Sequence, residues 1–109
     1  MRTTVYNKLV RDRIPEVIVG NGGQPKIRRL PPARLAGALK TKLLEEATEL
    51  KRAKTHADLV AELADVLEVL DALCAVSGID PKEVAQVQRE KRRKRGGFEE
   101  GIVLVSVRE

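Results

Sequence analysis

The segment from residue 32 to residue 76, PARLAGALKTKLLEEATELKRAKTHADLVAELADVLEVLDALCAV, decides the fold. Its first half repeats leucine at the spacing of one helical face, at Leu35, Leu39, Leu43 and Leu50. We predict a helix from about Pro32 to Lys54. A second helix follows from the N-cap Thr55 to about Val76, where Ser77-Gly78 ends it. The short connection between them predicts an antiparallel pair.

Weaker elements flank this pair. A short helix is expected at residues 15–19, and a third long helix runs from the cap Asp80 to about Arg95, before Gly96-Gly97. Residues 102–107 are rich in β-branched side chains and are expected to form a strand, which can pair with a short extended segment at residues 26–30 as a two-stranded element. The expected fold is therefore mainly α, a small helical bundle with the antiparallel pair at its core. We expect one domain over residues 1–109.

Composition limits both the core and the partners. The chain has one Phe, one Tyr and no Trp, so its core is aliphatic, and a homo-oligomer would relieve the shortage of burial. The net charge of +5 favours an anionic partner: a nucleic acid, a nucleotide or an anionic membrane. No apolar run approaches a membrane span and the N-terminus lacks an apolar signal region. We therefore expect a cytoplasmic protein without a membrane partner.

Several carboxylates fall on the apolar faces of the two helices. At about 100° per residue, Glu46 projects into the leucine stripe and Glu49 lies on the same flank. On the second helix, Glu62 and Asp65 project among valine, leucine and alanine. A buried unpaired carboxylate costs several kcal/mol. Either Lys and Arg side chains pair with these acids, or a divalent cation binds them.

The spacing of the acids favours the cation. Glu46 and Glu49 are three residues apart, as are Glu62 and Asp65, so each pair can reach one point beside its helix. An antiparallel helix pair could bring all four carboxylates around one centre. Oxygen ligation suits Mg²⁺, or Mn²⁺, rather than zinc.

These residues also carry a resemblance to a known family. Lys42-Leu-Leu-Glu-Glu-Ala-Thr-Glu49 followed by Glu62-Leu-Ala-Asp65 resembles the MazG-type signature, Glu-Glu-x-x-Glu and then Glu-x-x-Asp. That signature is typical of the all-α nucleoside-triphosphate pyrophosphatase superfamily, which includes phosphoribosyl-ATP pyrophosphohydrolase. The flanks, Tyr6 to Pro15 and Lys91 to Phe98, resemble a single-domain house-cleaning branch.

The resemblance implies a role for each acid. The metal ligands would be Glu46, Glu49, Glu62 and Asp65. Glu45 would bind a second ion or orient the attacking water, so the candidate catalytic residues are Glu45 and Glu46. The family implies a homodimer or homotetramer. The candidate phosphate-binding residues are Lys8, Arg11, Lys42, Lys91 and Arg95, and Tyr6 and Phe98 could flank the base.

The expected function is Mg²⁺-dependent hydrolysis of a nucleoside triphosphate, intact or damaged, at the α-phosphorus, giving a monophosphate and pyrophosphate. One alternative is a phosphoribosyl-ATP pyrophosphohydrolase. Another is a nucleic-acid-binding module, suggested by the basic run at residues 91–95, although no recognition motif or aromatic platform accompanies that run. A third is a structural helical dimerisation module whose acids pair with Arg and Lys.

Overall fold

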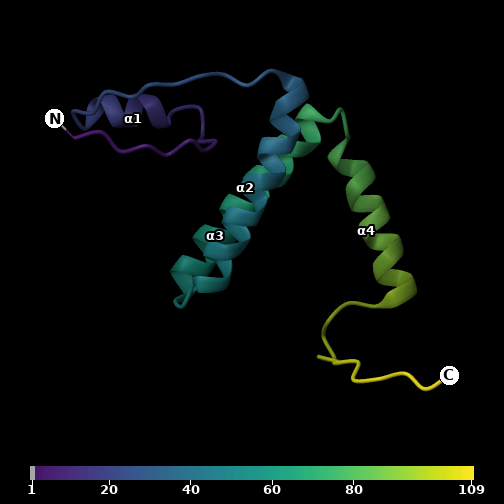
Figure 1. Cartoon of the computed structure of the whole chain (residues 1–109). Coiled ribbons are helices and arrows are strands. Elements are labelled where there is room, and N and C mark those ends of the chain that lie inside the picture. The colour runs from purple at the N-terminus through teal and green to yellow at the C-terminus, as the bar shows by residue number, and fades with distance from the viewer. Residues whose placement is uncertain (1) are drawn as a thin grey trace. The chain divides into compact units, whose positions relative to one another are not determined.

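The computed structural model describes residues 2–109 and is all-α over that range (Figure 1). The four helices are α1 (Ile14–Gly20), α2 (Pro32–Arg52), α3 (His56–Val76) and α4 (Pro81–Arg95). The predicted fold class is confirmed. The chain divides into two compact units, residues 1–78 and 79–109. None of the helices in the described range is long and apolar enough to cross a membrane.

Helices α2 and α3 form an antiparallel hairpin at the centre of the first unit (Figure 1). Pro31 occupies the N-cap position of α2 in an extended conformation, and the helix ends at Arg52 with Ala53 as its C-cap. The hydroxyl of Thr55 accepts a hydrogen bond of 3.1 Å from the Asp58 backbone N–H, which begins α3 after a three-residue connection. Gly78, with φ +66°, follows the end of α3, a conformation that favours glycine. The predicted helix pair is therefore present.

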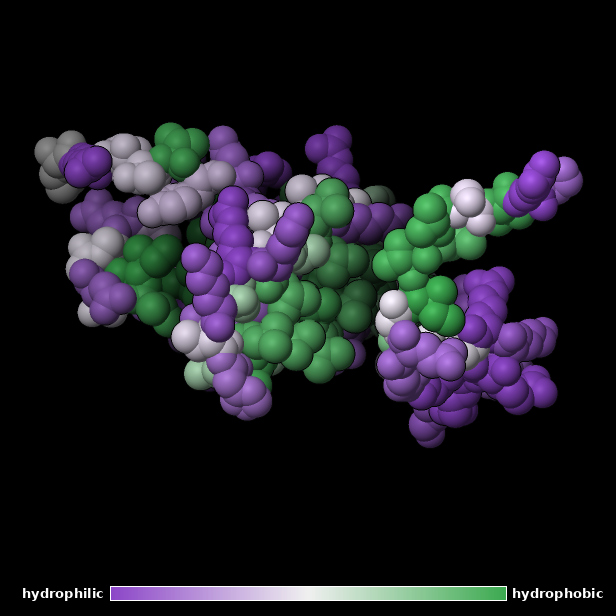
Figure 2. All heavy atoms as spheres, turned by 90° about the horizontal axis from the view of Figure 1, so that it is seen from below, coloured by the Kyte–Doolittle hydropathy of each residue, from purple (hydrophilic) through white to green (hydrophobic). Residues whose placement is uncertain are grey.

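The hairpin has a packed face and an exposed apolar face. Leu39 of α2 and Val69 of α3 are buried between the helices. On α3, a separate stripe remains exposed, formed by Leu59, Val60, Leu63, Leu67 and Leu70. Figure 2 shows green apolar surface open to solvent in this view. Helix α3 is thus apolar on two sides, and α2 covers one of them.

The N-terminal arm, residues 2–31, contains α1 as its helix. Pro15 lies in the first turn of α1, and the helix has no buried residue. Nearby, a Cβ on Gly23 would lie 2.6 Å from Cγ2 of Ile18, so a larger residue here would force Ile18 to shift. The arm therefore contributes little to the apolar core.

The second unit consists of α4 and the segment that follows it. The Asp80 carboxylate accepts a 2.9 Å hydrogen bond from the Lys82 N–H and caps the helix. Gly96 ends α4 with φ +79°, and Arg92 forms an ion pair with Glu99 beyond the glycines. This ion pair folds the segment after the helix back toward it.

The prediction of a two-stranded element was wrong. Neither residues 26–30 nor residues 102–107 form a strand in the described chain. Residues 102–105 are 75–89% exposed, so their apolar side chains do not pack against an apolar surface. A strand needs a partner for its backbone groups, and β propensity alone does not supply one. The single domain over residues 1–109 stays a prediction.

Candidate metal centre

Three carboxylates converge between α2 and α3. Glu46 comes from α2, and Glu62 and Asp65 come from α3. One oxygen of each lies within 4.8 Å of one oxygen of both others. All three residues are half-buried, because they lie on the helical faces that also carry Leu39 and Val69. Packing the hairpin therefore brings the acids together.

Glu62 is the least compensated of the three. Its Oε2 is buried and has no hydrogen-bond partner among the described residues. Burial is the main cause that raises the pKa of Glu62, and repulsion from Asp65, Glu46, Glu49 and Asp58 raises it further. A carboxylate held in this way is stabilised either by a proton or by a cation.

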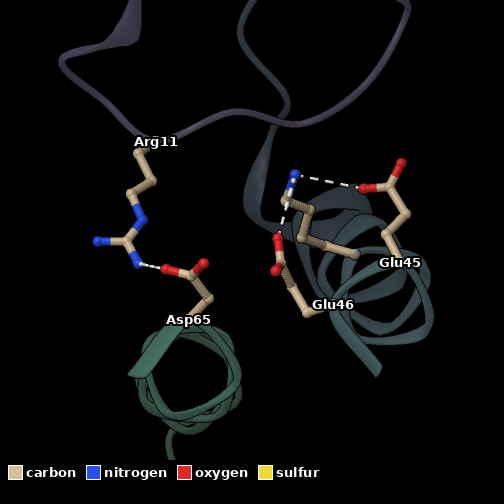
Figure 3. A network of polar contacts seen from close by, with 5 residues as sticks. Arg11, Glu45, Glu46 and Asp65 are labelled. Atoms are coloured by element: carbon tan, nitrogen blue, oxygen red, sulfur yellow. Dashed lines mark hydrogen bonds and ion pairs between the residues drawn. The ribbon is translucent and has the colours of Figure 1, made fainter. Parts of the chain in front are cut away.

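Two basic side chains already neutralise part of the cluster. Figure 3 shows Arg11 reaching from the N-terminal arm to Asp65, with 2.7 Å between Nη2 and Oδ1. Lys42 contacts both Glu45 and Glu46, with Nζ 3.2 Å and 3.6 Å from their carboxylate oxygens. Ion pairs therefore form on two sides of the cluster, while Glu62 keeps an unpaired oxygen, and binding of a divalent cation stays a prediction.

Glu49 lies outside the converging trio. It pairs with Arg52, with 3.6 Å between Oε1 and Nη1, and its side chain is 55% exposed. Three residues turn the helix by about 300°, which places Glu49 about 60° from Glu46 and on the rim of the packed face. The i,i+3 spacing to Arg52 was a local signal for this pair. Its role as a ligand stays a prediction.

A groove of about 350 Å³ runs beside the acids on α2. Its lining includes Lys42, Glu45, Glu46, Thr48 and Glu49, together with Lys8 from the arm. Tyr6 also belongs to the arm, and the Lys8 Nζ lies 6.0 Å from the centre of its ring. The groove thus combines carboxylates with two lysines, Lys8 and Lys42.

The remaining predicted contacts lie in the second unit. Lys91, Arg95 and Phe98 line a cavity of about 930 Å³ beside α4, with Gly96 and Gly97 at its end. A Cβ on Gly97 would lie 2.3 Å from Nη1 of Arg92, so the backbone passes close to that side chain. The roles of Lys91 and Arg95 in phosphate binding and of Phe98 beside the base stay predictions.

Fold and site together define a class: an all-α protein whose antiparallel helix pair carries oxygen ligands suited to a divalent cation. Comparison with known families places the chain within it. Residues 24–92 match the family model of phosphoribosyl-ATP pyrophosphohydrolase, and the chain belongs to this family. The match contains Lys42 and all five candidate acids. It excludes Tyr6, Lys8, Arg11, Arg95 and Phe98.

One relative is an uncharacterized protein of Mycolicibacterium smegmatis (strain ATCC 700084 / mc(2)155), which is 50% identical over 48 residues. The aligned part is 44% of this chain and 49% of the relative, so the chain spans about half the length of that protein. No solved structure matches the chain. The family is therefore shown, while the substrate remains a matter for proposal.

Proposed function

We propose that this pyrophosphohydrolase cleaves a nucleoside triphosphate at the α-phosphorus in a Mg²⁺-dependent reaction, giving a monophosphate and pyrophosphate. The natural substrates would be modified or damaged nucleotides, a house-cleaning activity in the cytoplasm. The observation that carries the proposal is the convergence of Glu46, Glu62 and Asp65 within 4.8 Å, with one Glu62 oxygen unpaired. The family match supports the same chemistry.

The residues present fit a hard divalent cation. Glu46, Glu62 and Asp65 offer carboxylate oxygens only, the ligand type that Mg²⁺ and Mn²⁺ prefer. Glu49, one turn along α2, would complete the set after leaving Arg52. A bound ion would neutralise phosphate oxygens and lower the pKa of a bound water.

The neighbouring side chains divide the remaining work. Glu45 is 40% exposed beside the trio and would orient the attacking water and take its proton. Lys42 now contacts Glu45 and Glu46, so its ammonium group is placed to contact a phosphate at the same point. Lys8 borders this groove and would contact the triphosphate, with Tyr6 of the same arm beside the base. Lys91, Arg95 and Phe98 line the cavity beside α4, and their contacts with phosphate and base stay predictions.

The test is a panel of natural and modified nucleoside triphosphates, incubated with Mg²⁺ and then with EDTA, with all products resolved. We expect metal-dependent release of monophosphate and pyrophosphate. Glu46→Gln should lower turnover at least about 100-fold, since even residues that only support a metal ligand contribute about 10–100-fold. Glu68→Gln is the matched control, because Glu68 is an exposed acid of α3 outside the trio.

Three other results would each contradict the proposal or support a different function. Release of orthophosphate and a diphosphate would contradict attack at the α-phosphorus. Turnover of phosphoribosyl-ATP alone would support the second candidate, which the name of the matching family favours. No turnover, with nucleic-acid binding that weakens steeply with salt, would favour the basic helix α4 as a nucleic-acid surface.

We also propose that the chain functions as a homo-oligomer, at least a homodimer. The uncovered stripe of α3 contains no charge and is bordered on its helix by Asp71 and Glu68. The outer face of α2 carries the 71% exposed Leu44, with Lys51 and Lys40 on one side of it at about 20° and 40° in projection. A second hairpin can therefore bring both leucine and opposite charge to the stripe.

A further inference from the structure

The contact between Arg11 and Asp65 joins two parts of the first unit that are 54 residues apart in the sequence. Arg11 lies on the N-terminal arm, whose helix α1 has no buried residue. Asp65 lies in the middle of α3 and belongs to the converging trio. It is the long-range ion pair that holds the arm against the acids in the described chain.

The Asp65 carboxylate takes part in two contacts of opposite kind. Asp65 Oδ1 accepts the hydrogen bond from the Arg11 guanidinium at 2.7 Å. Asp65 also offers an oxygen within 4.8 Å of those from Glu46 and Glu62. A guanidinium and a divalent ion are both positive and both need this carboxylate. They therefore compete, unless Asp65 shares its two oxygens between them.

The ion pair between Arg11 and Asp65 is weak enough for a divalent ion to displace it. The Arg11 and Asp65 side chains are 57% and 40% exposed. Ion pairs at such positions contribute little and are screened by salt, whereas a divalent ion gathers three carboxylates at once. The ion should therefore displace the guanidinium rather than be excluded by it.

We propose that Arg11 is a placeholder cation, which latches the N-terminal arm to Asp65 until a divalent ion binds and releases it. This inference rests on the proposed divalent-cation site. Release of the latch frees the Arg11 guanidinium beside the metal-loaded cluster, where the triphosphate of the substrate would arrive. Arg11 is thus a positioning residue that couples the arm to the metal, and metal binding precedes the engagement of the arm with substrate.

The chain provides its own probe of the arm. Tyr6 is the one tyrosine, the chain has no tryptophan, and four residues separate Tyr6 from Arg11. The anisotropy of tyrosine fluorescence therefore reports the motion of the arm without any label. We expect the anisotropy of the wild-type protein to fall when Mg²⁺ is added to the metal-free protein, and to recover with EDTA.

Two arginine variants separate the loss of the Arg11–Asp65 ion pair from the general effect of removing one positive charge from the arm. Arg11→Gln and Arg13→Gln remove the same charge from the same arm, and Arg13 is exposed without an acidic partner among the described residues. Calorimetry should show Mg²⁺ binding about two- to fivefold tighter in Arg11→Gln than in Arg13→Gln, the range expected for losing one exposed ion pair. The arm of Arg11→Gln should already show low anisotropy in EDTA, and Mg²⁺ should not change it.

Asp65→Asn provides a second test, because it breaks the latch from the other side. Its arm should be released in EDTA, as in Arg11→Gln. Equal Mg²⁺ affinities for the two arginine variants, or unchanged anisotropy in wild-type protein that binds Mg²⁺, would overturn the latch and leave the proposed function intact. A wild-type protein that binds no divalent ion at all would overturn both.

Discussion

The α2–α3 hairpin and helix α4 use charge in opposite ways. Helix α3 carries five acids and no Lys or Arg: Asp58, Glu62, Asp65, Glu68 and Asp71. Helix α4 carries seven Lys or Arg and two acids. In the hairpin, two of the acids of α3 meet Glu46 on a face packed against the partner helix. In α4, every charged residue is exposed.

The difference shows that placement, not the amount of charge, indicates a site. The charges of α4 remain solvated, so the helix needs nothing bound to be stable. The acids of the hairpin lose solvent and repel one another, and the raised pKa of Glu62 records that cost. A basic run such as that of α4 is visible in the sequence at once, yet the hairpin has the stronger need for a ligand.

The largest expected effect concerns packing in the hairpin. Leu39→Ala removes one of the two apolar side chains that are buried in the described chain and should lower the free energy of unfolding by about 2–5 kcal/mol. Val87→Ala is the control in α4, where the side chain is 45% exposed, and should change it by about 0.5 kcal/mol or less. Urea unfolding followed by circular dichroism measures both. Equal losses would mean that the two units do not differ in packing as described.

Local patterns predicted most of this fold. The hydroxyl of Thr55 and the carboxylate of Asp80 cap helices where expected, since a cap needs only residues within one turn. Helical periodicity also placed Glu46, Glu62 and Asp65 on inner faces, and the hairpin then brought them together.

The remaining features depend on contacts that have no local signal. The pair between Arg11 and Asp65 spans 54 residues, so no spacing rule could predict it. The failed strand prediction has a similar cause, because residues 102–107 have β propensity but the sequence cannot say which segment lies beside them.

The next prediction concerns the charge of Glu62. Removing this charge should raise thermal stability without metal and lower it with metal. In EDTA at neutral pH, Glu62→Gln should unfold at a higher temperature than wild type, because it removes a carboxylate that is buried among other acids. With Mg²⁺ at about 100 times its dissociation constant, wild type should gain about 2.7 kcal/mol, and the variant much less. Thermal unfolding with and without Mg²⁺ measures the reversal.

Glu62→Gln also tests how the stability of the folded protein depends on pH. The pKa of Glu62 in the folded protein lies above its ordinary value of 4.5, so the folded state binds that proton more tightly than the unfolded state. This contribution to stability is complete below the unfolded pKa and is lost as pH rises through the raised pKa. Wild type should therefore lose stability relative to Glu62→Gln as pH rises above about 4.5 in EDTA. Glu68→Gln should follow wild type, and a parallel shift in both variants would contradict a special role for Glu62.

The smallest effect tests the outer face of the hairpin against the tail of the second unit. Leu67→Ala should weaken self-association about tenfold, or about 1.4 kcal/mol, because Leu67 is 60% exposed in the uncharged stripe of α3. Leu104→Ala makes the same chemical change at a 75% exposed position of the tail and should leave association unchanged. Sedimentation equilibrium over a range of concentrations and salt measures both. If another part of the same chain covers the stripe, the protein will remain monomeric at every concentration, and Leu67→Ala will lower the stability of the monomer instead.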